Sequence, residues 1–106
     1  MKENKVELRL SKYAEEDIRQ ILTYSLEVWG KKQFQKYQSQ IQSALDTIQK
    51  NPTSGRVRRR DQLFPGGLSY SFGTHIIFFR IKGDIIEVVR ILHQKMDFIS
   101  HLPEDS

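Results

Sequence analysis

The side chains best suited to chemistry are cations, and they gather near the middle and the carboxyl end of the chain. A histidine that moves a proton, beside an arginine or lysine that stabilises a pentacovalent phosphate, is the arrangement that RNA hydrolysis needs. The candidates for such a site are Arg58, Arg59, Arg60, Arg80, Arg90, His93, Lys95 and His101.

Each of these residues, taken singly, is explained more simply by structure than by catalysis. Arg80 is expected to lie opposite Glu87 across a hairpin and to pair with it. Arg90 is expected to be a hydrogen-bonded structural residue of the sheet, and His93 stands at the end of a predicted strand. We therefore predict no catalytic residue and a protein that is not an enzyme.

Other reaction classes find little support. The chain has no cysteine, which excludes a disulfide scaffold, a thiolate metal site and a cysteine nucleophile. Its histidines, His75, His93 and His101, match no metal-ligand spacing. No glycine-rich phosphate loop and no G-x-S-x-G elbow occurs. The sequence thus predicts no metal, no cofactor and no small-molecule substrate.

Positive charge is concentrated in one short segment. The formal net charge is +4, and Arg56, Arg58, Arg59 and Arg60 supply four charges, while the other basic residues balance the 13 acidic ones. Such a cluster suits nucleic acid or another anionic surface. It equally suits a solvated loop that keeps an adhesive segment soluble, so direct nucleic-acid binding stays open.

The elements that would position these residues are read from periodicity. With 106 residues the chain is expected to form one domain, with a core over about residues 5–102. Residues 5–10 alternate as a half-buried strand does. Ser11 is a good N-cap for a helix that ends at Gly30, and a second helix ends before Asn51 and Pro52. Two helices of similar length joined by a short turn predict an antiparallel helical hairpin.

A loop and three strands complete the prediction. Residues 53–67 show no period, and strands are expected at 68–72, 76–81 and 85–92, with a two-residue turn at Gly83 and Asp84. The fold class is α+β: an N-terminal strand and a helical hairpin packed on a small antiparallel sheet of three to four strands. Asp17 is expected to be a helix-surface charge, and residues 103–106 a frayed tail. The face expected under the hairpin consists of Ile77, Phe79, Ile81, Ile86, Val88 and Leu92, with Arg90 as its one charge.

No stretch of the sequence resembles a membrane span. The longest apolar run, residues 76–79, is far shorter than the about 20 residues that a crossing needs. The first residues lack the apolar stretch of a secretory signal. A cytoplasmic location is the expectation.

Three segments in order resemble the ParE toxin family. They are SKYAEEDI at 11–18 with Ile21, Tyr24, Trp29 and Gly30; Asn51 and Pro52 with Gly55 and RVR at 56–58; and GTHIIFFR at 73–80 followed by VRILHQKMD at 89–97. The resemblance runs over about residues 5–102. It implies the same architecture, a toxin of a type II toxin–antitoxin pair, inhibition of DNA gyrase by binding, and neutralisation by a ParD-like antitoxin that wraps around it.

Within this resemblance, two groups of residues are candidates for contacts. Target binding is assigned to Arg58, Arg59 and Arg60 and to a closing group of His93, Lys95, Met96 and Asp97. Antitoxin binding is assigned to the aromatic residues Tyr24, Trp29, Phe34 and Tyr37, for which burial in the core is the alternative.

The alternative within the RelE/ParE superfamily is a ribosome-dependent mRNA endonuclease of the RelE type. Those relatives carry an arginine where His75 stands, and an arginine and a tyrosine where Lys95 and His101 fall. The chain also departs from the ParE pattern, which has arginines where Leu68 and often Thr74 stand. Weakened inhibition, or an inactive remnant kept as an antitoxin partner, is therefore a further hypothesis.

Overall fold

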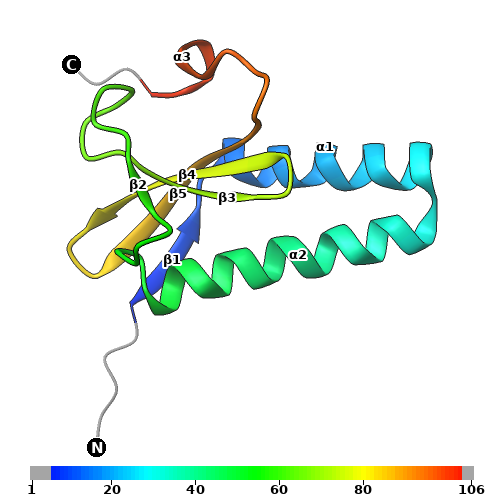
Figure 1. The fold of residues 1–106 in the computed structure, drawn as a ribbon, viewed down its shortest axis with the longest axis horizontal. Helices are drawn as coiled ribbons and strands as arrows, with labels where there is room; N and C mark the ends of the chain where they lie inside the picture. The colour runs from blue at the N-terminus through cyan, green and yellow to red at the C-terminus, as the bar shows by residue number, and fades with distance from the viewer. Residues whose placement is uncertain (1–5, 104–106) are drawn as a thin grey trace, which may run out of the picture.

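Two long helices and a sheet make up most of residues 6–103, the part of the chain that the structure, a computed structural model, describes (Figure 1). This arrangement confirms the predicted α+β fold class. The expected start of the first strand at Lys5, and the tail from 104 to 106, lie outside the described residues. In chain order the elements are β1 (Glu7–Leu10), α1 (Lys12–Trp29), α2 (Lys31–Lys50), β2 (Arg58–Arg59), β3 (Leu68–Phe72), β4 (His75–Lys82), β5 (Ile85–His93) and α3 (Phe98–His101).

The predicted boundaries of the helical hairpin are confirmed. The Ser11 hydroxyl accepts the Ala14 N–H at 2.9 Å, which caps α1, and donates to the Val89 carbonyl at 2.8 Å, which ties the start of the helix to β5. Gly30 separates the helices with a φ of +95°, a conformation that L side chains rarely adopt. The chain therefore reverses between α1 and α2 within one residue.

The sheet differs from the prediction in size and in one pairing. The described residues form five strands in the order β1-β5-β4-β3-β2, rather than three to four. β1 runs parallel to β5, whereas the other pairs are antiparallel. The parallel pairing joins residues 7–10 to residues 85–88, which are far apart in the sequence, and β2 is only two residues long. Neither feature leaves a periodic signal in the sequence, which is why both were missed.

A β-bulge in β5 changes which residues face the helices. Phe79 pairs with Val88 and Phe78 with Arg90, so Val89 is an extra residue. Because one extra residue reverses the alternation, Leu92 lies on the face away from the helices, and its predicted place under the hairpin is wrong. The turn at Gly83 and Asp84 is confirmed by the pairing of Lys82 with Ile85.

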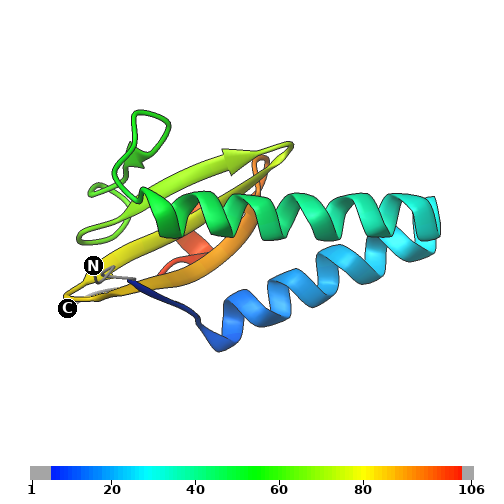
Figure 2. The same cartoon turned by 90° about the horizontal axis from the view of Figure 1, so that it is seen from below.

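The helices cover one face of the sheet and extend beyond its end (Figures 1 and 2). The main core lies between them, with Ala14, Ile41 and Ile48 packed against Ile77, Phe79 and Val88. At the free end of the hairpin, Val28 and Trp29 are exposed. The predicted apolar stripe of α1 is therefore only partly used by this chain's own core.

The opposite face of the sheet is covered by two irregular segments rather than by a long helix. Phe64, from the loop between β2 and β3, contacts Phe78, and Phe98 and Leu102 pack there from the carboxyl end. Figure 1 shows this loop and α3 on the same side of the sheet. Over the described residues, neither long helix has the continuous apolar stretch needed to cross a bilayer.

Candidate functional site

An ion pair between α1 and β5 organises the region around the carboxyl end. The Asp17 carboxylate accepts hydrogen bonds from Nε and Nη2 of Arg90, both at 2.8 Å, and from the backbone N–H of Ile91 at 2.9 Å. The hydrogen bond to Asp17 raises the pKa of Arg90. Asp17 is only 8% exposed, so its prediction as a helix-surface charge is wrong.

The position of Asp17 follows from the shape of the sheet. β1 pairs with β5 only as far as Val88, so the edge of β5 beyond that residue has no neighbouring strand. α1 begins at this point and passes over the edge, where Asp17 takes the place of a strand as acceptor for the Ile91 N–H. Arg90 is thus a hydrogen-bonded structural residue, as predicted.

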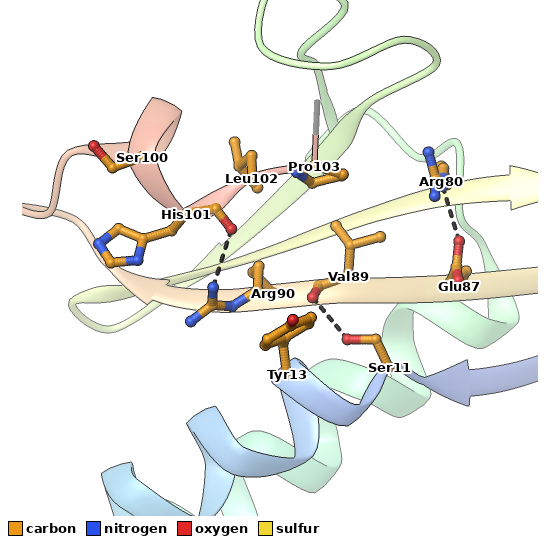
Figure 3. Close-up of a pocket in the computed structure, with 10 residues that line it drawn as sticks. All are labelled: Ser11, Tyr13, Arg80, Glu87, Val89, Arg90, Ser100, His101, Leu102 and Pro103. Carbon is orange, nitrogen blue, oxygen red and sulfur yellow. Dashed lines mark hydrogen bonds and ion pairs between the residues drawn. The ribbon is translucent and has the colours of Figure 1, made fainter. Parts of the chain in front are cut away.

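Arg90 also reaches the last helix. Its Nη1 donates to the His101 carbonyl at 3.0 Å, and its guanidinium lies 5.5 Å from the centre of the Tyr13 ring (Figure 3). These groups belong to a pocket of about 450 Å³ between the start of α1, β5 and residues 100–103. Because each Arg90 nitrogen already has an acceptor, the arginine serves to join elements.

The second expected pair, Arg80 with Glu87, is confirmed in the same pocket. The two residues pair across β4 and β5, and Arg80 Nε donates to Glu87 Oε1 at 2.8 Å (Figure 3). Two of the arginines considered for phosphate chemistry, Arg80 and Arg90, therefore hold carboxylates of this chain.

A separate aromatic pocket lies between the outer half of the helical hairpin and the end of the sheet. It has a volume of about 430 Å³. Tyr24 and Trp29 of α1 are 61% and 66% exposed, and Tyr37 of α2 is half-buried. The lining residues are Gln20, Ile21, Tyr24, Trp29, Tyr37, Thr74, His75 and His93. This pocket can receive an apolar side chain of a partner.

Two histidines, His75 and His93, line the aromatic pocket. His75 and His93 pair across β4 and β5, with ring centres 5.3 Å apart in an edge-on arrangement, and Tyr37 lies 5.8 Å from His75. Burial lowers the pKa of His75, the neighbouring His93 lowers it further, and Asp17 opposes the shift. These surroundings therefore favour the neutral form of His75.

The predicted antitoxin-binding residues are partly brought together. Tyr24, Trp29 and Tyr37 share the aromatic pocket, whereas Phe34 is half-buried on α2 and does not line it. None of the four belongs to the buried clusters of the described residues. His93, a predicted target-binding residue, lies in the same pocket.

The three arginines of the basic loop have different surroundings. Arg58 and Arg59 are exposed on β2 at the edge of the sheet, and Arg59 pairs with Asp61 at 3.0 Å. Arg60 is partly buried: its Nε donates to the Ser69 hydroxyl at 2.8 Å and its guanidinium lies over the Phe78 ring. Burial lowers the pKa of Arg60, with Arg58 adding repulsion. The basic surface is therefore smaller than the sequence suggests.

The predicted closing residues lie apart from the arginines. Lys95, Met96 and Asp97 are exposed after β5, where Gln94 N–H donates to the Thr74 carbonyl and Met96 N–H to the His93 carbonyl. Arg59 pairs with Leu68 at the first residue of β3, whereas His93 pairs with His75 beside the last residue of β3. The arginines and the closing residues therefore lie near opposite ends of β3.

Two positions that depart from the ParE pattern also differ in setting. Leu68 packs half-buried against the main core, and Thr74 is exposed at the rim of the aromatic pocket. Among residues 6–103, no group of three or more metal-ligating side chains comes together.

Sequence reasoning missed the roles of Asp17 and Tyr13. The signal for Asp17 was its place three residues after Ala14, on the buried stripe of α1. A carboxylate that is buried in such a stripe needs a basic partner to offset the loss of hydration. Nothing in the sequence indicated that the partner would be Arg90.

The arrangement of a helical hairpin on this sheet is shared with proteins of solved toxin–antitoxin complexes. A chain of the structure described as the chromosomal ParDE TA system from P. aeruginosa superposes with a TM-score of 0.72 at 20% identity, covering 86% of this chain and 98% of that one. A chain of the toxin–antitoxin complex RelBE2 from Mycobacterium tuberculosis gives 0.60 at 15% identity, covering 84% and 98%. The chain therefore belongs to the same fold class as these two chains of solved structures.

Sequence comparison identifies the family within this class. The family model described as ParE toxin of type II toxin-antitoxin system, parDE, matches residues 8–98. Toxin ParE1 of Mycobacterium tuberculosis (strain H37Rv) is 37% identical over 89 residues, 83% of this chain and 89% of the relative. Toxin ParE1 of Caulobacter vibrioides (strain CB 15) is 34% identical over 94 residues, 89% and 95%. The chain belongs to the ParE toxin family of type II toxin–antitoxin systems.

Proposed function

We propose that this toxin inhibits DNA gyrase by binding it, without breaking covalent bonds itself, and that a ParD-like antitoxin neutralises it. The observation that carries the proposal is membership of the ParE family, supported by surfaces suited to binding. The neighbouring fold in a ParDE assembly supports an antitoxin as partner.

The antitoxin is assigned to the outer half of the helical hairpin. Tyr24 and Trp29 are exposed and line the aromatic pocket, and Leu26 and Val28 are exposed on the same part of α1. Exposed large apolar side chains gathered at one end of a small domain are typical of a protein-binding surface. An otherwise disordered segment that folds on binding can cover a large surface of this kind.

The gyrase contact is assigned to the exposed closing residues Lys95, Met96 and Asp97, with His93 beside them. Arg58 and Arg59 provide a second, basic contact at the edge of the sheet. Their exposure supports a role in binding a large partner, since neither is needed to complete the core. The partially buried Arg60 is assigned to the structure of the loop.

A non-catalytic mode of action is supported by the engagement of the arginines. Arg80 and Arg90 hold Glu87 and Asp17, so both guanidinium groups are committed to carboxylates. The RelE-type alternative would depend on Lys95 and His101. Lys95 is exposed, and the backbone of His101 is held by Arg90.

A supercoiling assay tests the proposal. Relaxed plasmid, ATP and purified DNA gyrase are incubated with increasing amounts of toxin, with and without a ParD-like antitoxin. We expect supercoiling to fall as toxin is added and to recover when the antitoxin is present in excess. Undiminished supercoiling at all toxin concentrations would remove gyrase as the target.

A further inference from the structure

We propose that Asp17 and Arg90 are positioning residues for the C-terminal segment, defined here as residues 94–103, which presents Lys95, Met96 and Asp97 to the target. The inference rests on the proposed function. It adds a role for a buried ion pair that lies outside the assigned contacts.

Residues 98–103 are joined to the sheet by a hydrogen bond from Arg90. Its Nη1 donates to the His101 carbonyl at 3.0 Å. Apolar contacts add to this bond: the Phe98 ring centre lies 5.0 Å from that of Phe78, and Leu102 is buried. Because apolar contacts are not directional, the hydrogen bond from Arg90 contributes to the orientation of α3 in a way that they do not.

Asp17 orients Arg90. Its carboxylate binds Nε and Nη2 in a two-point contact, which fixes the plane of the guanidinium and thereby directs Nη1 toward the His101 carbonyl. Tyr13 covers the guanidinium at 5.5 Å. Asp17 of α1 therefore holds Arg90, and Arg90 in turn holds α3. Figure 3 shows the bond from Arg90 to the His101 carbonyl.

The exposed closing residues lie between two fixed points of the chain. The segment leaves β5 through a turn held by hydrogen bonds from Gln94 and Met96, and it reaches α3 at Phe98. Lys95, Met96 and Asp97 lie between these points. Their placement on the surface thus depends on the turn at one end and on the α3 anchor at the other.

The test compares two variants with a matched control. Asp17→Asn removes the charge that holds Arg90, and Arg90→Lys keeps the charge but loses the planar two-point contact. Glu87→Gln is the control because it removes a partly buried carboxylate that pairs with another arginine of the same sheet, and Glu87 is not itself among the described residues that hydrogen-bond to Arg90 or the His101 carbonyl. Each protein is first checked for folding by circular dichroism. If Asp17→Asn does not fold, Arg90→Lys is the variant compared with the control.

Two readouts are measured on each protein. Gyrase inhibition gives the toxin concentration for half-maximal loss of supercoiling. Hydrogen exchange at the amides of Leu102 and Met96, which donate to the Phe98 and His93 carbonyls, reports the order of the segment directly. We expect both positioning variants to need about tenfold more toxin, the size of one lost charge-assisted hydrogen bond. We also expect faster exchange at these amides, whereas Glu87→Gln behaves as wild type.

The outcomes separate the two proposals. If wild-type toxin inhibits gyrase and the positioning variants inhibit it as well as Glu87→Gln does, the positioning role is overturned. If wild-type toxin leaves gyrase unaffected, the proposed target is wrong. In that case hydrogen exchange is the only test of the positioning role. Faster exchange at the Leu102 and Met96 amides in the variants supports that role, and unchanged exchange overturns it.

Discussion

The aromatic pocket makes a sharp prediction for Tyr24→Ala, because α1 offers a matched control of the same residue type. Tyr24 lies at the pocket and is 61% exposed, and Tyr13 lies near the start of the same helix and is 70% exposed. A tyrosine can bury about 200 Å², so roughly 120 Å² of Tyr24 is left for a partner to cover. At about 25 cal/mol per Å² this area is worth at most about 3 kcal/mol.

Only part of this area term is realised on association, since ordering costs oppose it. We expect Tyr24→Ala to lose about 2 kcal/mol of antitoxin binding, or a roughly 30-fold rise in Kd. Tyr13→Ala should change the Kd less than about twofold. Because both side chains are mostly exposed, each variant should cost about 1 kcal/mol or less of unfolding free energy.

Isothermal titration of each variant with the ParD-like antitoxin that neutralises the wild-type toxin measures the Kd, and urea unfolding measures stability. Equal Kd values for Tyr24→Ala and Tyr13→Ala would refute the assignment of the antitoxin to the aromatic pocket. A large loss of stability in Tyr24→Ala alone would show that the residue belongs to the core instead.

Three further predictions concern stability, each measured by urea unfolding. The pKa of His75 is lowered in the folded state, so below about pH 6.5 the unfolded chain binds a proton that the folded chain does not, and the free energy of unfolding should fall as the pH drops. His75→Gln should weaken this pH dependence, and an unchanged pH profile in this variant would contradict the prediction. Gly67→Ala should destabilise by about 1–3 kcal/mol, since an added Cβ would lie 2.8 Å from the Arg60 carbonyl oxygen and from the Phe64 ring. Gly55→Ala, with nothing within 4 Å, is its control, and equal stability of the two would refute the clash. Ser25→Ala should leave the free energy of unfolding unchanged or raise it by up to about 1 kcal/mol, because the buried Ser25 hydroxyl has no hydrogen-bond partner among the described residues. A clear loss of stability in this variant would show that the hydroxyl does have a partner.

Local signals in the sequence predicted the local structure well. The N-cap at Ser11, the break at Gly30 and the turn at Gly83 depend on neighbouring residues, and all three are present. The pairing of Arg80 with Glu87 followed directly from that turn, because the register of a hairpin is set by its loop. Family resemblance added the architecture as a whole.

Features that depend on distant parts of the chain were not predictable in this way. The parallel pairing of β1 with β5 joins residues almost 80 positions apart. The bulge at Val89 moved Leu92 to the other face, although the alternation before it had been read correctly. Asp17 was assigned to the surface because its partner, Arg90, is separated from it by 73 residues. The same limit applies to the aromatic pocket, which combines both helices with the end of the sheet.

We propose that this toxin acts by binding a macromolecular partner, DNA gyrase, and does not itself break covalent bonds. The most direct measurement is to stop a gyrase reaction with detergent and protease in the presence of toxin, and to quantify linear plasmid. The family resemblance implies that the toxin holds gyrase on plasmid that gyrase itself has cut. We therefore predict that linear DNA accumulates with toxin and that none forms when gyrase is omitted. A translating extract treated with the same preparation should keep its mRNA intact. Messenger RNA cut at the ribosome, with no linear plasmid in the gyrase reaction and with cutting abolished by Lys95→Ala or His101→Ala, would contradict the account.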